Sequence, residues 1–249
     1  MSEYIWGRNP IMETLQSVRK VKRILLAEGS KREGGTLNTI IQEAQKRQIP
    51  VETVPRARLD QMSKGAVHQG CVAIVAEREY ASTDDILALA AQRNEPPFLL
   101  LLDSIQDVNN LGSLLRTAEA AGVHGVIIPE HRAAEVNATV VKTSAGATEH
   151  IMIARETNLT RTIDYLKQQN IWVVGLAGEG DTLYTQANLT GALAVVVGNE
   201  GKGMGRLVRE HCDVLIKLPM HGYINSLNAA VAGSITLYEA LRQRALASR

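Results

Sequence analysis

The feature that most constrains the fold is a series of short apolar segments, each followed by a polar turn or a helical pattern. They lie at residues 98–102, 126–128, 171–176, 193–197 and 214–218. Strands that are buried on both faces read as continuous apolar runs, whereas half-exposed strands alternate. Because helical patterns separate these runs, we predict an α/β domain with a parallel sheet flanked by helices.

The intervening segments predict the covering helices. A helix over 111–121 is closed by Gly122, a residue type that suits the end of a helix. Further helices are expected at 138–147 and 159–169, and a long one at 227–246 ends the pattern.

The beginning of the chain predicts a smaller α/β module. Its expected elements are helices at 9–15, 37–47 and 58–62 and strands at 21–26, 51–54 and 71–75. The polar stretch that follows contains one predicted helix, at 84–93, with capping groups at 82–85. We therefore expect a substrate-binding domain over 1–76, a linker over 77–96 and a larger domain over 97–249.

Composition limits the class of protein. With 249 residues, 45% of them hydrophobic, the chain can bury a full-sized core. No apolar run reaches the roughly 18 residues of a membrane span, and the start of the chain shows no secretory signal, so we expect a cytoplasmic protein without a membrane partner. Cys71 and Cys212 stand alone, and the histidines show no ligand spacing, so no metal is expected.

The charge is unevenly distributed. Residues 1–75 contain 12 Lys and Arg against 7 Asp and Glu, whereas residues 76–249 contain 15 against 19. A positively charged first part is typical of a module that contacts a polyanion, although an ordinary solvated surface gives the same balance.

Three polar blocks follow the apolar strands of the larger domain, at 107–118, 198–203 and 218–228. Open α/β sheets bind ligands at the carboxyl ends of their strands. The blocks concentrate polar groups that a packed core does not require, namely Asn110, Arg116, Glu200, Ser226 and Asn228. The pattern therefore indicates an enzyme with one crevice at this edge of the sheet.

Individual residues leave alternatives open. Arg116 lies in a helix expected to be mostly buried, with the helix starting after Asn110, so its guanidinium needs an anion, either in a salt bridge or on a substrate phosphate. Ser226 suits a helix cap or a ligand contact. The block 198–203 lacks the P-loop and dinucleotide spacings, which disfavours a nucleotide hydrolase.

Taken together, the blocks resemble the three motifs of the SPOUT-class RNA 2′-O-ribose methyltransferases, in their TrmH (SpoU) branch. The matching residues are Asn110, Gly112, Arg116 and Thr117; Gly198, Glu200, Gly201 and Gly203; and Pro219, Gly222, Ser226, Leu227 and Asn228. The segment Gly7–Pro10 and the turn His68–Gly70 resemble the substrate-binding domain of the members that methylate a guanosine in 23S ribosomal RNA.

This resemblance implies a C-terminal trefoil knot, a homodimer and S-adenosylmethionine as cofactor. The implied cofactor residues are Gly198, Gly201, Leu218, Pro219, Met220, Ser226, Leu227 and Asn228. Arg116 would hold a phosphate and orient the ribose hydroxyl, with Asn110, Glu200, Ser226 and Asn228 completing the catalytic set.

The first domain would bind ribosomal RNA through Arg8, Arg19, Lys20, Lys22 and Arg23, unless these are only solvated surface residues. Two alternatives stay open at this point. The chain could transfer a methyl group from S-adenosylmethionine to a ribose of transfer RNA instead of 23S ribosomal RNA. It could also be a non-catalytic RNA-binding factor in ribosome assembly.

Overall fold

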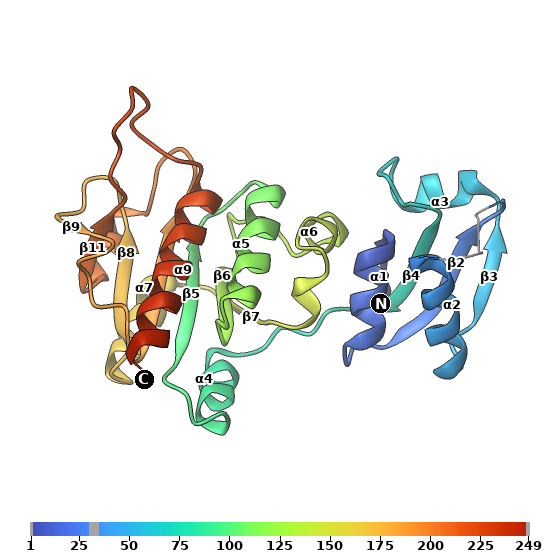
Figure 1. The fold of residues 1–249 in the computed structure, drawn as a ribbon, viewed down its shortest axis with the longest axis horizontal. Coiled ribbons are helices and arrows are strands. Elements are labelled where there is room, and N and C mark those ends of the chain that lie inside the picture. The colour runs from blue at the N-terminus through green and yellow to red at the C-terminus, as the bar shows by residue number, and fades with distance from the viewer. Residues whose placement is uncertain (1, 30–34, 248–249) are drawn as a thin grey trace. The chain divides into compact units, whose positions relative to one another are not determined.

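The computed structural model describes residues 2–29 and 35–247, which form two compact units (Figure 1). The first unit comprises Met1–Glu79 together with Val136–His150, and the second comprises Tyr80–Glu135 and Ile151–Arg249. The first unit is therefore built from two separate stretches of the chain. The sequence, by contrast, suggested contiguous domains.

The first unit is centred on a four-stranded sheet with the order β1-β4-β2-β3. Its strands are β1 (Ser2–Trp6), β2 (Val21–Ala27), β3 (Val51–Val54) and β4 (Cys71–Ala76). β4 runs antiparallel to both β1 and β2, whereas β2 and β3 are parallel. Its helices are α1 (Arg8–Gln16), α2 (Thr36–Lys46) and α3 (Arg56–Met62).

β1, the first strand of this sheet, was not predicted from the sequence. β1 begins with Ser2, Glu3 and Tyr4, so no continuous apolar run marks it, and Tyr4 is 44% exposed. Only Ile5 and Trp6 are buried. The pairing with β4 decides its conformation, and such a non-local partner is not visible in a local pattern.

Segment 136–150 completes the core of the first unit. The predicted helix over 138–147 is shorter in the structure: α6 (Ala138–Thr143) is followed by a 3-10 turn, η1 (Ala147–Glu149). Val141 of α6 is buried in a cluster with Ile5 and Leu15. Gly146, with φ +93°, begins η1 and lies so close to Glu13 that a Cβ there would be 2.5 Å from that side chain.

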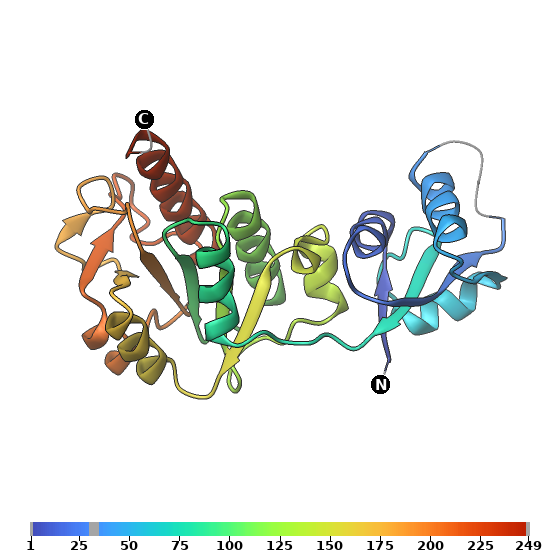
Figure 2. The ribbon, with the colours of Figure 1, turned by 90° about the horizontal axis from the view of Figure 1, so that it is seen from below.

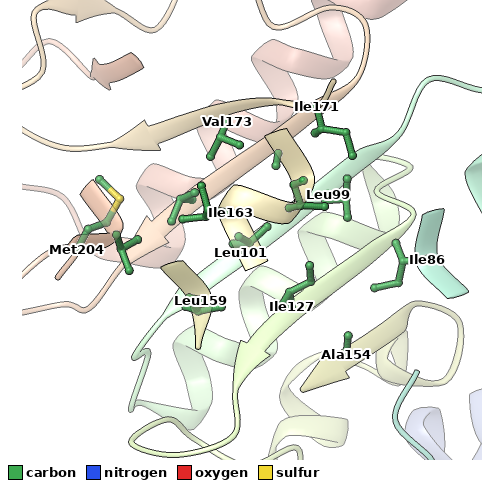
Figure 3. Packing of buried hydrophobic residues seen from close by; sticks show 14 residues of the cluster. Ile86, Leu99, Leu101, Ile127, Ala154, Leu159, Ile163, Ile171, Val173 and Met204 are labelled. Carbon is green, nitrogen blue, oxygen red and sulfur yellow. The ribbon is translucent and has the colours of Figure 1, made fainter. Parts of the chain in front are cut away.

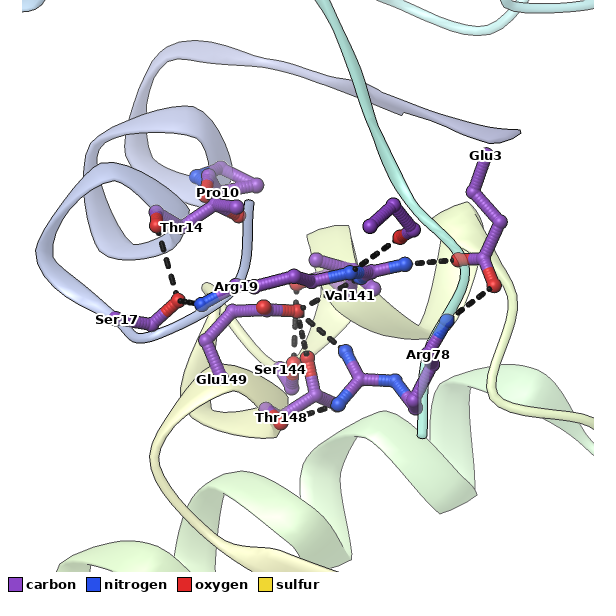
Figure 4. Close-up of polar contacts among 11 residues, drawn as sticks. Glu3, Pro10, Thr14, Ser17, Arg19, Arg78, Val141, Ser144, Thr148 and Glu149 are labelled. Atoms are coloured by element: carbon purple, nitrogen blue, oxygen red, sulfur yellow. Dashed lines mark hydrogen bonds and ion pairs between the residues drawn. The ribbon is translucent and has the colours of Figure 1, made fainter. Parts of the chain in front are cut away.

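A buried cluster of charges joins this segment to the N-terminal stretch (Figure 4). The carboxylate of Glu149, 1% exposed, pairs with both Arg19 and Arg78. Arg19 also pairs with Glu3, and its Nε donates to the carbonyl of Ala76 at 2.9 Å. Two buried guanidinium groups thus share one buried carboxylate, an arrangement that is strongly destabilised when one member is lost.

The second unit contains the predicted parallel sheet. Seven strands follow the order β7-β6-β5-β10-β8-β11-β9, and every pair is parallel. The strands are β5 (Phe98–Asp103), β6 (Gly125–Pro129), β7 (Met152–Glu156), β8 (Trp172–Leu176), β9 (Thr182–Leu183), β10 (Leu193–Gly198) and β11 (Val214–Lys217). The continuous apolar runs are therefore confirmed as strands, of which β5, β6 and β10 are buried almost throughout, whereas β11 buries only Ile216.

Helices cover both faces of this sheet (Figures 1 and 2). They are α4 (Thr83–Gln92), α5 (Val108–Ala120), α7 (Leu159–Gln168), α8 (Arg206–His211) and α9 (Ala229–Ala247). Ile86 of α4, Ile163 of α7 and Val208 of α8 pack with Leu99 and Leu101 of β5 in one core, much of which Figure 3 shows.

The other face is covered by α5 and α9, which pack against each other. A Cβ on Gly233 of α9 would lie 2.6 Å from Leu114 of α5 and 3.1 Å from Val197 of β10, so only glycine allows this approach. The hydroxyls of Thr117 and Ser234 are also 2.9 Å apart across the two helices. In the described parts of the chain, no helix combines the length and apolarity needed to cross a membrane.

Candidate functional site

One cavity of the second unit lies beyond the carboxyl ends of β8, β10 and β11. Its volume is about 330 Å³, within the usual range of small-molecule sites. Residues from the segments 176–179, 197–204 and 218–232 line it, together with Arg209. The predicted crevice at this edge of the sheet is therefore present, and it is built from loops that are far apart in the sequence.

The glycine-rich loop after β10 forms one wall of the cavity. A Cβ on Gly198 would lie 2.2 Å from the backbone nitrogen of Met204, so the loop can fold back on the strand only because this residue is glycine. Asn199 and Gly203 exchange two backbone hydrogen bonds, at 2.9 and 3.0 Å. The side-chain oxygen of Asn199 also accepts from the amides of Gly201 and Lys202.

Three predicted catalytic residues form a chain of hydrogen bonds beside this loop. The amide nitrogen of Asn228 donates to the side-chain oxygen of Asn110 at 2.8 Å. The amide nitrogen of Asn110 donates in turn to Oε1 of Glu200 at 2.7 Å. The three motifs are thus joined directly by their side chains, although residues 110 and 228 are separated by 118 positions.

We call this chain of hydrogen bonds the relay Asn228–Asn110–Glu200. The start of α9 decides which atom donates and which accepts along it. The side-chain oxygen of Asn228 accepts from the backbone amides of Ala230 at 2.8 Å and Val231 at 3.2 Å, which makes Asn228 the N-terminal cap of the helix. With its oxygen committed to the cap, the amide of Asn228 presents donors to Asn110, and Asn110 must then present its own donor to Glu200. Of the two roles that the sequence left open for Ser226, a helix cap or a ligand contact, the cap is thus taken by Asn228.

The helix that carries Asn110 starts earlier than expected. Asp107 caps α5 by accepting from the amides of Asn109 at 2.8 Å and Asn110 at 2.9 Å, and the helix begins at Val108. Asn110 therefore lies in the first turn of α5, not ahead of it. Asp107 was the residue in the sequence that could have predicted this earlier start, because aspartate is a preferred N-terminal cap of helices.

Arg116 is not buried, contrary to the sequence interpretation. It lies on the exposed side of α5, outside the residues that line the cavity. The apolar neighbours Leu114 and Leu115 are buried on the other sides of the same helix. Within one chain, the structure therefore does not bring Arg116 to the relay.

The predicted cofactor residues divide into two groups. Those on the cavity wall are Gly198, Gly201, Leu218, Met220, Ser226 and Leu227. Pro219 and Asn228 do not line the cavity. Asn228 is instead connected to the cavity wall through its hydrogen bond to Asn110, which in turn holds Glu200.

The cavity wall that follows β8 was not predicted from the sequence. Gly178 and Glu179 come directly after this strand, and Arg209 of α8 lies beside them in the lining. Hydrogen bonds from a backbone N–H and from Arg209 hold the pKa of Glu179 below its ordinary value. The rule that ligands bind at carboxyl ends of parallel strands, applied to β8, would have found these residues.

The cavity has the surface that a nucleoside-like cofactor requires. Leu176, Met204, Leu218 and Leu227 supply apolar walls for a flat base. The loop 198–203 supplies close backbone groups because its glycines carry no side chains, and Glu179 and Glu200 supply carboxylates. S-Adenosylmethionine, with an adenosine part and a cationic sulfonium, fits this combination of apolar walls and acceptors.

The residues predicted to contact RNA are placed differently from one another. Arg19 is 8% exposed and held by Glu3 and Glu149, so it is not available to a phosphate. Arg23 forms a half-exposed ion pair with Glu52 at 2.8 Å. Lys22 donates to the hydroxyl of Ser2, and Lys20 is exposed.

Arg8, the first residue of α1, contacts the tight turn between α3 and β4. Its Nε donates to the carbonyl of Gln69 at 3.3 Å, and its backbone amide donates to Oε1 of Gln69 at 2.8 Å. His68 orders the same turn from inside: Nδ1 accepts from the amide of Gly70, and Nε2 lies 3.0 Å from Asp60. Among the residues described, no group of three or more His, Cys, Asp or Glu side chains is arranged to hold a metal ion.

Comparisons with protein families match both parts of the chain. The SpoU rRNA Methylase family matches residues 97–238, and the family of RNA 2′-O ribose methyltransferase substrate-binding domains matches residues 4–81.

Individual relatives extend over nearly the whole chain. A TrmH family tRNA/rRNA methyltransferase of Bacillus subtilis, YacO, is 48% identical over 97% of this chain and 96% of its own length. The 23S rRNA (guanosine-2′-O-)-methyltransferase RlmB of Escherichia coli is 44% identical over 98% of this chain and 100% of its own length.

Solved structures agree with these relatives. The SpoU methyltransferase AviRb of Streptomyces viridochromogenes, in complex with the cofactor AdoMet, superposes with a TM-score of 0.82 at 25% identity, covering 98% of this chain and 91% of that one. The family matches, the identities and the shared fold all agree, and the chain belongs to the SpoU (TrmH) family of RNA methylases.

Proposed function

We propose that this protein transfers the methyl group of S-adenosylmethionine to the 2′-hydroxyl of a guanosine ribose in 23S ribosomal RNA. The observation that carries the proposal is the relay Asn228–Asn110–Glu200, which ends at the wall of a cavity suited to this cofactor. The RlmB relative, which is named for the same reaction, supports the choice of substrate.

The bound cofactor supplies an electrophilic methyl group on a sulfonium. The task of the protein is to place a ribose hydroxyl in line with that methyl group, since correct positioning removes much of the barrier. We assign to Asn110 and Asn228 the orientation of Glu200, and to Ser226 the shaping of the wall where the ribose enters.

We further propose that the active site is completed in a homodimer. The apolar residues Val231, Ile235, Tyr238 and Leu241 of α9 lie three or four positions apart and are 36–52% exposed. This stripe forms one face of a helix, and an exposed apolar face of this kind marks an interaction surface. Packing two copies along it would cover the stripe.

The dimer also gives Arg116 a role that it lacks within one chain. Arg116 is exposed on α5, the helix that packs beside α9. We propose that it reaches the cavity of the partner subunit, where it holds an RNA phosphate and orients the hydroxyl. Arginine does not lose its proton in proteins, so its contribution is electrostatic.

The remaining assignments concern the RNA and the course of the chain. We propose that the first unit binds ribosomal RNA through the exposed cations Lys20, Lys22 and Arg23 and the half-buried Arg8, and that the protein acts in the cytoplasm. We also propose that the C-terminal segment is knotted. This is supported by the position of β10 between β5 and β8, and by the return of α9 onto α5.

The test is methyl transfer from labelled S-adenosylmethionine onto ribosomal RNA, followed by mapping of the methylated nucleotide. Label in a guanosine ribose of 23S RNA is expected. Label only in transfer RNA would favour the alternative that the chain methylates transfer RNA. Absence of transfer together with tight RNA binding would favour a non-catalytic assembly factor instead.

A further inference from the structure

Asp103, the last residue of β5, is a buried carboxylate outside the three motifs. The residue is 8% exposed and lies opposite Gly198 in the register of β5 with β10. It is not among the residues that line the cavity. Its contacts nevertheless reach both ends of the loop 199–205, which forms the glycine-rich wall of that cavity.

The carboxylate holds the far end of this loop directly. Its Oδ2 accepts from the backbone amide of Gly205 at 2.6 Å, immediately before α8 begins. A Cβ on Gly205 would lie 3.3 Å from the same oxygen, so the loop and the carboxylate are in close contact. A hydrogen bond to an ionised carboxylate is stronger than one between neutral groups.

The near end of the loop is held through Ser104. Oδ1 of Asp103 accepts from the hydroxyl of Ser104 at 3.0 Å. Ser104 has a φ of +62°, a left-handed conformation that non-glycine residues seldom adopt. In this conformation its carbonyl accepts from the amide nitrogen of Asn199 at 2.8 Å, while the other end of that amide accepts from Gly201 and Lys202.

We infer that Asp103 is a positioning residue for methyl transfer, because it fixes both ends of the loop that carries Glu200 and the backbone of the cofactor wall. This inference rests on the proposed function. Strain in the backbone persists where the surrounding contacts enforce it, and such strain gathers at functional sites. Asp103 and Ser104, at the end of β5, thus hold the two ends of the loop. The hydrogen bond from Asn110 holds Glu200 within it.

The test compares Asp103→Ala with a matched carboxylate variant in the full-length protein. Asp213 also accepts a backbone amide, that of Val173 at 2.8 Å, and is 15% exposed, but it lies at the other end of β8, away from the cavity. For each protein, the thermal midpoint, the dissociation constant for S-adenosylmethionine by calorimetry, and kcat are measured.

We expect Asp103→Ala to weaken cofactor binding or reduce kcat by about tenfold or more, because small displacements of a site have effects of this size. Asp213→Ala should lower the thermal midpoint but leave the dissociation constant unchanged. Asp103→Asn should restore most of the activity, since its oxygen can accept from Gly205 and its amide can donate to the hydroxyl of Ser104.

Two outcomes would overturn the inference: wild-type binding and kcat in folded Asp103→Ala, or an equal loss of cofactor binding in Asp213→Ala. If Asp103→Ala does not fold, Asn199→Asp removes the hydrogen bond through which Ser104 holds the near end of the loop, because a carboxylate cannot donate to the carbonyl of Ser104. Unchanged cofactor binding in that variant would also count against the inference. A wild-type protein that bound no S-adenosylmethionine would instead refute the proposed function. Amide hydrogen exchange of residues 200–205 would then still report whether Asp103 holds the loop.

Discussion

At the scale of single residues, Asn228 makes two kinds of hydrogen bond at once. Its oxygen caps α9, and its nitrogen donates to Asn110. The cap therefore decides which atom faces the neighbouring side chain. An amide can accept from a helix start with its oxygen and donate to another acceptor with its nitrogen, whereas a carboxylate can only accept.

Asn228→Asp separates these two contributions. The carboxylate still caps α9 and is favoured at a helix N-terminus, so stability should change by less than about 0.5 kcal/mol. It cannot donate to Asn110, so we expect kcat for methyl transfer to fall about tenfold to a hundredfold.

Asn158→Asp is the matched control for this change. Asn158 caps α7 by accepting from the amide of Arg161 at 3.1 Å and has no part in the relay. Its variant should retain both stability and kcat. Wild-type turnover in Asn228→Asp would show that the relay does not act in catalysis.

At the scale of elements, the segment containing α6 and η1 belongs to the first unit although it lies between two strands of the second. The chain therefore passes between the units at residues 79–80, 135–136 and 150–151. The buried carboxylate of Glu149 is the polar centre of this attachment, with Val141 as its apolar part (Figure 4).

Glu149→Gln should destabilise the first unit by about 3 kcal/mol or more, because it leaves two buried guanidinium groups without their shared carboxylate. The measurement is urea unfolding followed by the fluorescence of Trp6 in a Trp172→Phe background, since the two tryptophans lie in different units. Glu52→Gln, which removes an exposed ion pair with Arg23, should cost less than about 1 kcal/mol. Equal effects of the two changes would contradict the assignment.

His124, at the start of β6, gives the second unit a dependence on pH. Its Nδ1 accepts from the amide of Phe98 at 3.0 Å, and its Nε2 lies 3.0 Å from Glu95. Burial lowers the pKa of the imidazole below 6.5, and Glu95 only partly opposes this. Below pH 6.5 the unfolded chain therefore binds a proton that the folded chain does not.

The contribution of His124 to the free energy of unfolding should thus be complete above pH 6.5. It should fall as the pH decreases from 6.5 towards the pKa of His124 in the folded protein, with a slope of at most about 1.4 kcal/mol per pH unit. Urea unfolding at pH 7.5 and 5.5, followed by Trp172 in a Trp6→Phe background, measures the change. His124→Gln should lose less stability between these two values than the parent protein. An identical loss in both would assign the pH dependence to other groups.

At the scale of the whole molecule, the proposed dimer explains two features of one chain: the exposed apolar stripe on α9 and the exposed Arg116 beside it. A two-fold pair would cover the stripe with an identical stripe, as symmetric interfaces do. It would also make the active site dependent on assembly.

Tyr238→Glu should dissociate the dimer and abolish most of the methyl transfer, because it places charge in the middle of the apolar stripe. Leu207→Glu on α8 is the control, since Leu207 is 53% exposed, similar to Tyr238 at 52%, but lies off the stripe. Sedimentation velocity gives the oligomeric state of each variant. A dimer that survives Tyr238→Glu would require a different interface.

The local sequence pattern was enough to predict most strands of the parallel sheet and the position of the candidate site. Five continuous apolar runs predicted five of the seven strands of the parallel sheet, because a strand buried on both faces needs apolar residues at every position; β7 and β9 carry no such run and were not predicted. The polar blocks after these strands predicted the crevice, since parallel strands end at one edge of the sheet. Asn110, Glu200 and Asn228 were correctly placed together for that reason.

Tertiary structure alone decided the remaining features. It buried Arg19 and exposed Arg116, because burial depends on which surfaces pack and not on the neighbouring residues in sequence. It placed 136–150 in the first unit through the contacts of Val141 and Glu149. It also gave Asp103 its role, since a carboxylate at a strand end acquires a function only when distant backbone amides fold onto it. Sequence periodicity reports local conformation, whereas these features depend on contacts between segments that are remote in the chain.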